Sequence, residues 1–337
     1  IWERGTGVMN KIEVIGLGAL NLDHIYRVEN IIADGETVVN EAVLSPGGSS
    51  ANTIYGLAKL GVATGFSGVI GDDPEGRLLL QDFQKAGTDT TQIRLKPGAR
   101  TGSTLCLSDK PGNRSLYVIP GANNQLGWDD LDLSYLNQAG IIHLSSFAGD
   151  RQFKISLELM DRLDSSIKLS FTPGALYSRR GLKALAPILK RTYLLFINHN
   201  ELQQLTGEDV ITGAETCLKQ GCHIIVVTLG KGVKLKSGRR SNRSTINASC
   251  YIRDADSEYV IEPPGRGAGA EIDTTGAGDA FAAGLLYGLF KDKGLEECGR
   301  LGNIVAQFSV TRAGAREGLP TVDELSDRYR ELYSQQP

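Results

Sequence analysis

Residues 271–281 read Glu-Ile-Asp-Thr-Thr-Gly-Ala-Gly-Asp-Ala-Phe, and small and apolar residues then recur at helical spacing, which predicts that a buried helix begins here. Three residues of its first turn carry little or no side chain: Gly276, Ala277 and Gly278. Free backbone N–H groups and the positive end of the helix dipole can therefore hold a phosphoryl group. Asp279 follows directly and can accept a proton from an attacking hydroxyl. The alternative is an ordinary glycine-rich helix start with a capping aspartate.

Short apolar runs recur along the rest of the chain without the alternation of half-exposed strands. They are Glu13–Leu17, Ala63–Ile70, Gly140–Leu144, Ile167–Phe171, Tyr193–Ile197 and His223–Leu229. Runs of this length suit strands that are buried on both faces of a parallel sheet. Helices are predicted between them, for example Ala51–Leu60 before Gly61, and a helix that begins at Pro74 and ends near Gly87. This alternation predicts a doubly wound α/β domain.

Two segments, Ile25–Leu44 and Ala99–Ile119, are instead polar, alternating and rich in turn residues, among them Pro111-Gly112-Asn113. We expect these segments, 25–44 and 99–119, to form a small β-sheet that stands off the main domain. The main domain then comprises residues 11–24, 45–98 and 120–330. Residues 1–10 lack the apolar core of a signal peptide and are expected to be a disordered extension.

The overall composition is that of an ordinary globular protein, with 337 residues, 41% hydrophobic and 22% charged. The net charge of −3 and the scattered basic residues argue against a nucleic-acid partner. No apolar run approaches the about 20 residues that span a bilayer, so no membrane partner is expected. The five cysteines form no CxxC pair, which favours free thiols and a cytoplasmic location.

Two other classes of nucleotide-binding protein are disfavoured by their motifs. The stretch from Gly16 to Asn21 begins like a dinucleotide fingerprint but lacks its third glycine. The GxxxxGK[ST] run of P-loop kinases and the HRD and DFG elements of protein kinases are missing from the sequence.

Residues 273–279 resemble the C-terminal signature of the ribokinase-like (pfkB) carbohydrate and nucleoside kinases. Further matches follow the family's order across about residues 11–325, in Asn21-Leu22-Asp23, Pro46–Asn52, Asn198–Glu201 and Thr228–Gly232. The resemblance implies a three-layer α/β/α domain with a central, mostly parallel sheet and a small β-sheet lid. It also implies ATP-dependent transfer of a phosphoryl group to a sugar-type hydroxymethyl group, with Asp279 as the base and residues 276–278 as the anion hole.

The same resemblance assigns the candidate ligand contacts. Acceptor-binding residues would be Asn21, Asp23, Gly47, Gly48 and Asn52. Nucleotide-binding residues would be Asn198, Thr228, Gly230 and Gly232, and Glu201 would hold Mg²⁺ through water. Without the family, these residues also fit a solvated loop aspartate, plain glycine turns and an ordinary helical glutamate.

A segment near the C-terminus, Ser309–Ala315, resembles the part of ribokinase that holds a monovalent cation. The ligands would then be Asp273, Thr275, Ser309, Arg312 and Gly314, and potassium is the expected ion. Gly318 stands where the family usually has a serine.

The sequence departs from ribokinase where that enzyme contacts ribose. Ser49 replaces a lysine, and Ser145 and Ser146 stand in place of a glutamate, so free ribose is not the expected acceptor. A nucleoside acceptor is the alternative, and Phe147 or Tyr177 could then stack on its base. The other interpretation of these two aromatic residues is an ordinary place in the core or in a loop. A sugar phosphate would instead use the basic residues near the lid, which are Arg27, Arg100 and Arg114. A non-catalytic binding protein on the same scaffold, and a homodimer formed through the lid, also stay open.

Overall fold

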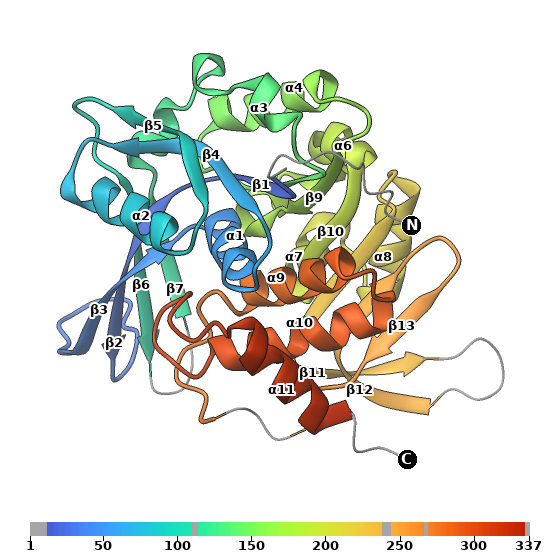
Figure 1. The fold of residues 1–337 in the computed structure, drawn as a ribbon. Coiled ribbons are helices and arrows are strands. Elements are labelled where there is room, and N and C mark those ends of the chain that lie inside the picture. Colours follow the sequence, from blue (N-terminus) through green and yellow to red (C-terminus); the bar gives the residue numbers. More distant parts are fainter. Residues whose placement is uncertain (1–11, 110–113, 238–243, 266–268, 334–337) are drawn as a thin grey trace.

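The computed structural model describes residues 12–109, 114–237, 244–265 and 269–333 (Figure 1). The expected N-terminal extension, residues 1–10, and the expected turn Pro111-Gly112-Asn113 lie outside the described residues.

Within those segments nine strands form the central sheet, in the order β13-β12-β11-β10-β9-β8-β1-β4-β5. Their bounds are β1 Val14–Leu17, β4 Thr64–Gly71, β5 Asp89–Lys96, β8 Ile141–Ser145, β9 Lys168–Thr172, β10 Thr192–Asn198, β11 Ile224–Ser237, β12 Ser244–Arg253 and β13 Glu258–Ile261. The strands from β11 to β5 pair in parallel, and β12 and β13 add antiparallel pairs at one edge. The predicted apolar runs correspond to β1, β4, β8, β9, β10 and the first half of β11.

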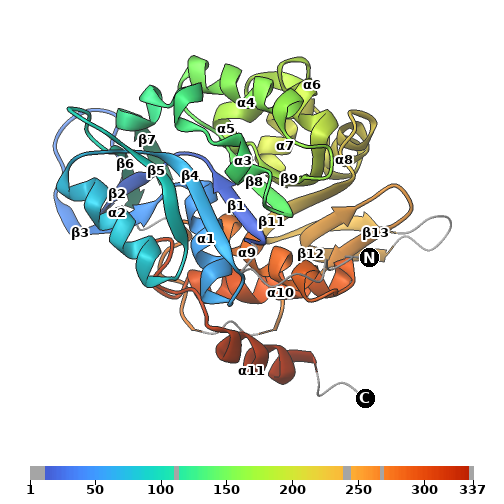
Figure 2. The ribbon, with the colours of Figure 1, turned by 45° about the horizontal axis from the view of Figure 1, so that its top comes forward.

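Helices cover both faces of this sheet (Figure 2). One face carries α1 Ser49–Lys59, α2 Pro74–Lys85, α9 Ala277–Phe290 and α10 Leu295–Ser309, with α11 Val322–Tyr333 packed outside α10. The other face carries α3 Leu133–Leu136, α4 Asp150–Arg162, α5 Gly174–Ser178, α6 Gly181–Arg191, α7 His199–Thr206 and α8 Val210–Lys219. The predicted three-layer architecture is confirmed. None of the helices in the described segments is long and apolar enough to cross a membrane.

The helix ends follow from local chemistry. Asp73 caps α2 by accepting a hydrogen bond from the Gly76 amide at 2.8 Å, and Pro74 takes the first helical position. After α1, Gly61 adopts a left-handed φ of 75°, a conformation that glycine accepts without strain.

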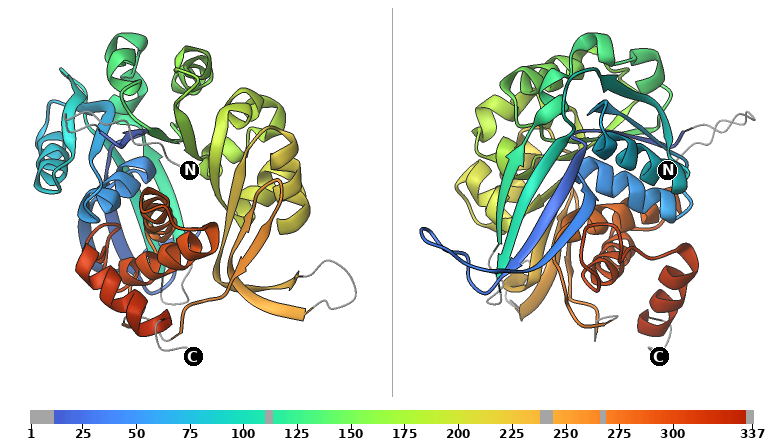
Figure 3. Two further views of the ribbon diagram at one scale, coloured as in Figure 1. Left: turned by 45° about the vertical axis from the view of Figure 1, so that its right-hand side comes forward. Right: turned by 90° about the vertical axis from the view of Figure 1, so that its left-hand side faces the viewer.

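A separate four-stranded sheet has the order β3-β2-β6-β7. Its strands are β2 Asn21–Val28, β3 Val39–Gly47, β6 Gly102–Asp109 and β7 Arg114–Ile119. These strands lie at one side of the molecule, and the connection from β2 to β3 projects from the body (Figure 3). The chain passes from the main sheet to the small sheet at residues 18–20, so Asn21 and Asp23, which were expected in the main domain, lie in a strand of the small sheet.

Candidate active site

Asp279 lies in the first turn of α9, and two side chains of α1 hold its carboxylate. Ser49 Oγ donates to Oδ1 at 2.7 Å, and Asn52 Nδ2 donates to Oδ2 at 2.9 Å. Helices α1 and α9 pack against each other on the same face of the sheet. The N-terminal and C-terminal signatures of the sequence therefore meet at this carboxylate.

The turn before Asp279 needs its glycine. Gly276 has a left-handed φ of 74°, and a Cβ there would lie 2.6 Å from Ala315 Cβ. A Cβ at Gly278 would meet nothing within 4 Å, so the turn is open on that side. An open amino end on a helix of 14 residues suits an anionic ligand.

The surroundings of Asp279 favour a base that works near neutral pH. Burial raises its pKa to about 6, although the hydrogen bonds from Asn52 and Ser49 oppose the rise. The charge of Glu201 raises this pKa further, and the charge of Arg114 lowers it. A carboxylate with such a pKa is ionised at neutral pH and accepts protons better than an ordinary aspartate.

A second carboxylate, Asp23 of β2, is buried on the side of the small sheet that faces the main domain. Burial raises its pKa to about 6, and a hydrogen bond with Thr104 of β6 lowers it. Arg316 lowers this pKa and Asp279 raises it, so the charges of the two aspartates interact. Two carboxylates on elements that face each other can accept hydrogen bonds from the hydroxyl groups of a ligand.

The other residues predicted to bind the phosphoryl acceptor are held in place by contacts within the protein. Asn21 Oδ1 accepts a hydrogen bond from Asn123 Nδ2 at 2.9 Å. Gly48 has a φ of 100°, and a Cβ there would lie 2.1 Å from the Ala19 carbonyl oxygen. Asn52 is bonded at both ends of its amide, to Asp279 and to Arg316.

Ser49 and Arg316 are site residues that the sequence analysis missed. Ser49 was noted only as a departure from ribokinase, yet its hydroxyl binds Asp279. Arg316 is 3% exposed and donates from Nε to Asn52 Oδ1 at 3.0 Å. The sequence signal for Arg316 was weak, because an arginine is more often found on the surface.

The residues predicted to bind nucleotide gather where β10 ends at Asn198 and its pairing with the longer strand β11 stops. Asn198 lies opposite Thr228 in the parallel register. Asn198 and Glu201 also cap α7 reciprocally, with Glu201 N to Asn198 Oδ1 at 2.9 Å and Asn198 N to Glu201 Oε2 at 3.1 Å. Gly230 and Gly232 follow with left-handed φ values of 59° and 108°. The charge of Glu201 raises the pKa of Asp279, so the two carboxylates interact electrostatically.

The residues predicted to bind a monovalent cation also lie together. Asp273 Oδ1 accepts from Thr275 N at 2.9 Å and from its hydroxyl at 2.7 Å, and Asp273 Oδ2 accepts from Gly314 N at 3.0 Å. Ser309 is buried beside Val310, whose carbonyl accepts from the backbone N–H of Asp273 at 3.2 Å. The side chain of Arg312 is exposed.

Two arginines of the small sheet contact the segment that leads into α9. Arg114 of β7 donates to Thr275 Oγ1 at 3.2 Å, and Arg27 of β2 donates to the Ile272 carbonyl at 3.1 Å. Arg27 also pairs with Glu41 of β3 at 3.2 Å. The small sheet is thus bonded to the loop that carries the C-terminal signature.

The two aromatic residues considered for stacking on a base are core residues. Phe147 is 2% exposed and Tyr177 is fully buried. Tyr177 packs edge-on against Phe153, with ring centroids 4.9 Å apart, and its hydroxyl lies 3.2 Å from Ser156 Oγ. The prediction that either residue stacks on a bound base is therefore wrong.

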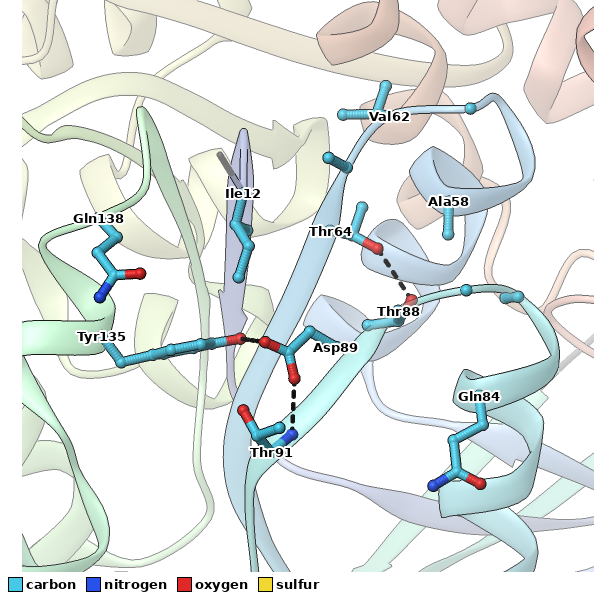
Figure 4. A pocket seen from close by; sticks show the side chains of 14 residues that line it. Ile12, Ala58, Val62, Thr64, Gln84, Thr88, Asp89, Thr91, Tyr135 and Gln138 are labelled. Atoms are coloured by element: carbon cyan, nitrogen blue, oxygen red, sulfur yellow. Dashed lines mark hydrogen bonds between the residues drawn. The ribbon is translucent and has the colours of Figure 1, made fainter. Parts of the chain in front are cut away.

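A cavity of about 860 Å³ lies at the amino ends of β1, β4 and β5 (Figure 4). The hydroxyl of Tyr135 donates to Asp89 Oδ2 at 3.2 Å, and Thr64 and Thr88 bond each other at 2.9 Å. Ligands of open parallel sheets bind outside the carboxyl ends of the strands, which is the opposite end. The candidate active site is therefore the cluster around Asp279 and Asp23.

Comparisons with known proteins identify the family of this chain. Residues 9–322 match the family described as pfkB family carbohydrate kinase. An uncharacterized sugar kinase of Archaeoglobus fulgidus is 38% identical over 79% of this chain and 98% of its own. An ATP-dependent ribose-1-phosphate kinase of Halopiger xanaduensis is 28% identical over 94% of this chain and 99% of its own.

Solved structures share the fold. The ribokinase of Thermotoga maritima superposes with a TM-score of 0.77 at 24% identity, covering 94% of this chain and 98% of its own. The nucleoside kinase of Methanocaldococcus jannaschii gives a TM-score of 0.75 at 24% identity, covering 95% and 99%. The chain therefore belongs to the pfkB family of carbohydrate kinases and is a phosphotransferase.

Proposed function

We propose that this enzyme transfers the γ-phosphoryl group of ATP to a hydroxymethyl group of a sugar-type acceptor. The observation that carries the proposal is the Asp279 carboxylate, fixed by Ser49 and Asn52 at the open amino end of α9 and coupled by charge to Asp23. This arrangement supplies a base and an anion site in one helical turn.

In the proposed reaction, Asp23 accepts hydrogen bonds from acceptor hydroxyls and orients the reacting one. The acceptor oxygen bonds to phosphorus while the bond from phosphorus to the ADP oxygen breaks, and the hydroxyl proton passes to Asp279. Backbone N–H groups of residues 276–278 stabilise the charge on the transferring group. The small sheet acts as a lid that excludes water, a competing acceptor.

Glu201 is the residue proposed to hold Mg²⁺, through water. Burial raises the pKa of its carboxyl, so a cation would relieve an unfavourable charge there. The described residues contain no cluster of three or more Asp, Glu, His or Cys side chains that would enclose a metal, which fits an ion that keeps most of its waters. Bound Mg²⁺ would neutralise phosphate charge.

A potassium ion is proposed where the segment before α9 meets the segment after α10, with ligands from Asp273, Thr275, Ser309, Arg312 and Gly314. Because the Asp273 carboxylate already accepts from Thr275 and Gly314, the ligands would be mainly backbone carbonyls. Arg312 would contribute only its carbonyl, since its side chain is exposed. Turnover should fall when potassium is replaced by a bulky organic cation, and an unchanged rate would remove the ion from the proposal.

A nucleoside is the second acceptor to consider, and a sugar phosphate is the third. The relatives include a nucleoside kinase of Methanocaldococcus jannaschii, 27% identical over 96% of this chain, besides the ribose-1-phosphate kinase. A base would need a contact other than Phe147 or Tyr177. The retained Asp279 and open turn argue against a non-catalytic binding protein, which needs no base.

The test is ADP release from ATP and Mg²⁺ with a panel of sugars, sugar phosphates and nucleosides. We expect release that depends on the acceptor, and a loss of orders of magnitude in kcat for Asp279→Asn with acceptor affinity retained. Near-wild-type turnover of Asp279→Asn would refute its role as base. Binding of an acceptor with no turnover under any donor would favour the binding protein.

We also propose that two copies associate through the small sheet. The face of this sheet opposite Asp23 carries Leu44, Tyr117 and Ile119, which are 59%, 56% and 57% exposed. Leu44, His24, Leu105 and Tyr117 form one cross-strand row, so the exposed side chains share a face. Light scattering should give a dimer mass that Leu44→Glu with Tyr117→Glu reduces, and a monomeric wild type would overturn the proposal.

A further inference from the structure

Arg316 is a buried cation in an enclosed setting. It is 3% exposed, and its guanidinium lies 5.1 Å from the ring centroid of Tyr55 and 5.0 Å from that of Phe83. Its Nη1 donates to Asp82 Oδ2 of α2 at 2.5 Å. A buried charge is tolerated only when it is paired and hydrogen-bonded, and Asp82 meets the first requirement.

The other donors of Arg316 point toward the candidate active site. Nε donates to Asn52 Oδ1 at 3.0 Å, and Nη2 donates to the Gly47 carbonyl at 3.4 Å. Asn52 in turn donates from Nδ2 to Asp279 Oδ2 at 2.9 Å. An unbroken chain of polar contacts thus runs from Asp82 through Arg316 and Asn52 to Asp279.

The chemistry of these groups determines how the Asn52 amide is turned. A guanidinium has only donors, and an ionised carboxylate has only acceptors. The amide oxygen must therefore face Arg316, and the amide nitrogen must face Asp279. If Arg316 did not occupy the oxygen, the amide would be free to rotate and to place its oxygen against the carboxylate, which is repulsive.

We infer that Arg316 is a positioning residue, which fixes the Asn52 amide in the one orientation that donates a hydrogen bond to Asp279. The inference rests on the proposed role of Asp279 as the base. It extends that proposal to a residue that touches neither the base nor the transferring group.

The protonation of Asp279 reports on this arrangement. The groups that act on its carboxyl are Ser49 and Asn52 of α1, Glu201 of α7, Arg114 of β7 and Asp23 of β2. The Asn52 hydrogen bond lowers the pKa of Asp279. Loss of this bond therefore raises that pKa, and the protein needs a higher pH to hold the base ionised.

Arg316→Lys separates positioning from ion pairing. Lysine keeps a positive charge beside Asp82 but lacks the fixed second donor at Nε. We expect a folded variant in which the acid limb of kcat moves up by about one pH unit, the scale of a hydrogen bond to a charged group. Titration of the Asp279 carboxyl by ¹³C NMR without substrates should show the same rise, with Asp279→Asn used to assign the signal.

Asn52→Ala should give the same rise, and combining it with Arg316→Lys should add nothing, because both changes remove one contact chain. The matched control is Arg253→Lys, since Arg253 is also largely buried and paired, with Glu258 at 3.1 Å, but lies in β12. Its Asp279 titration should match that of the wild type.

A folded Arg316→Lys protein with wild-type titration and pH profile overturns the inference. If Arg316→Lys does not fold, Asn52→Ala provides the test instead. An Asp279 pKa in Asn52→Ala that equals the wild-type value also overturns the inference. Because the NMR titration needs no turnover, it tests the inference even if an active Asp279→Asn enzyme were to defeat the proposed function.

Discussion

Gly47 lies so close to Asp23 that a Cβ at Gly47 would be 2.2 Å from Asp23 Oδ2 and 2.4 Å from its Cγ. The two residues belong to neighbouring antiparallel strands, β3 and β2. No real Cβ contact is that short, so the position of the Asp23 carboxylate depends on the missing side chain at residue 47. Gly47 of the N-terminal signature thus shapes the proposed acceptor site through Asp23.

Gly47→Ala should displace the Asp23 carboxylate without unfolding the chain. If Asp23 orients the acceptor, kcat/KM for the acceptor should fall about 10²-fold, the scale of a 1 Å misplacement, while KM for ATP changes little. Steady-state kinetics with each substrate varied would measure this. Gly294→Ala is the matched control, since a Cβ there meets nothing within 4 Å, and its kinetics should be those of the wild type.

The rate should fall as the pH is lowered through about 6. Burial raises the pKa of Asp279 to about 6, and below that value the base is protonated and cannot accept the hydroxyl proton. The pH profile of kcat/KM under saturating ATP tests this. In Asp23→Asn the neighbouring negative charge is gone, so the acid limb of the residual activity should move to lower pH. If the acid limb of the wild-type kcat/KM profile lay near pH 4, the raised pKa of Asp279 would be contradicted.

Asp279→Asn should make the protein more stable at pH 8 than the wild type. A carboxyl whose pKa is raised on folding stabilises the fold in its neutral form, and that contribution is lost as the pH rises through about 6. Asparagine stays neutral, so we expect a Tm higher by a few degrees at pH 8 and a smaller difference at pH 5. Asp150→Asn is the control, because Arg180 lowers the pKa of that exposed carboxyl and no gain at pH 8 is expected.

The main sheet and its helices could be predicted because local sequence carries their signals. The buried parallel strands are almost wholly apolar, and α2 begins where Asp73 and Pro74 supply a cap and a preset first residue. The turn before Asp279 was predictable for the same reason, since Gly276 adopts a left-handed φ there.

The membership of Asp23 in the small sheet was not predictable in this way. Its strand pairs in parallel with β6, so that Asn21 lies opposite Gly102, and a pairing between such distant segments leaves no local signal. Residues 21–24 were therefore assigned to the main domain, and only residues 25–44 to the small sheet.

The burial of Arg316 could not be predicted from the local sequence either. Nothing near Arg316 in the sequence indicates burial, because its partner Asp82 is 234 positions away in the chain. Only the packing of α2 against the C-terminal segment neutralises it. The role of Ser49 could not be predicted for the same reason, because its hydrogen bond to Asp279 depends on the contact between α1 and α9.

The contacts of Arg27 and Arg114 with the α9 loop lead to a prediction about water. If the small sheet closes over the acceptor, these two arginines hold it closed, through the Ile272 carbonyl and Thr275 Oγ1. Replacing both with methionine should loosen the closure and admit water as a competing acceptor.

The expected result for Arg27→Met with Arg114→Met is ADP release without acceptor that rises severalfold, together with a higher KM for the acceptor. Arg94→Met is the control, because Arg94 is exposed on β5 and bonds only to Gln92 among the contacts described for it. Loss of Arg114 also removes a charge that lowers the pKa of Asp279, so the acid limb should move slightly upward. An unchanged ratio of acceptor-independent to acceptor-dependent release would show that these bonds do not hold the small sheet closed during turnover.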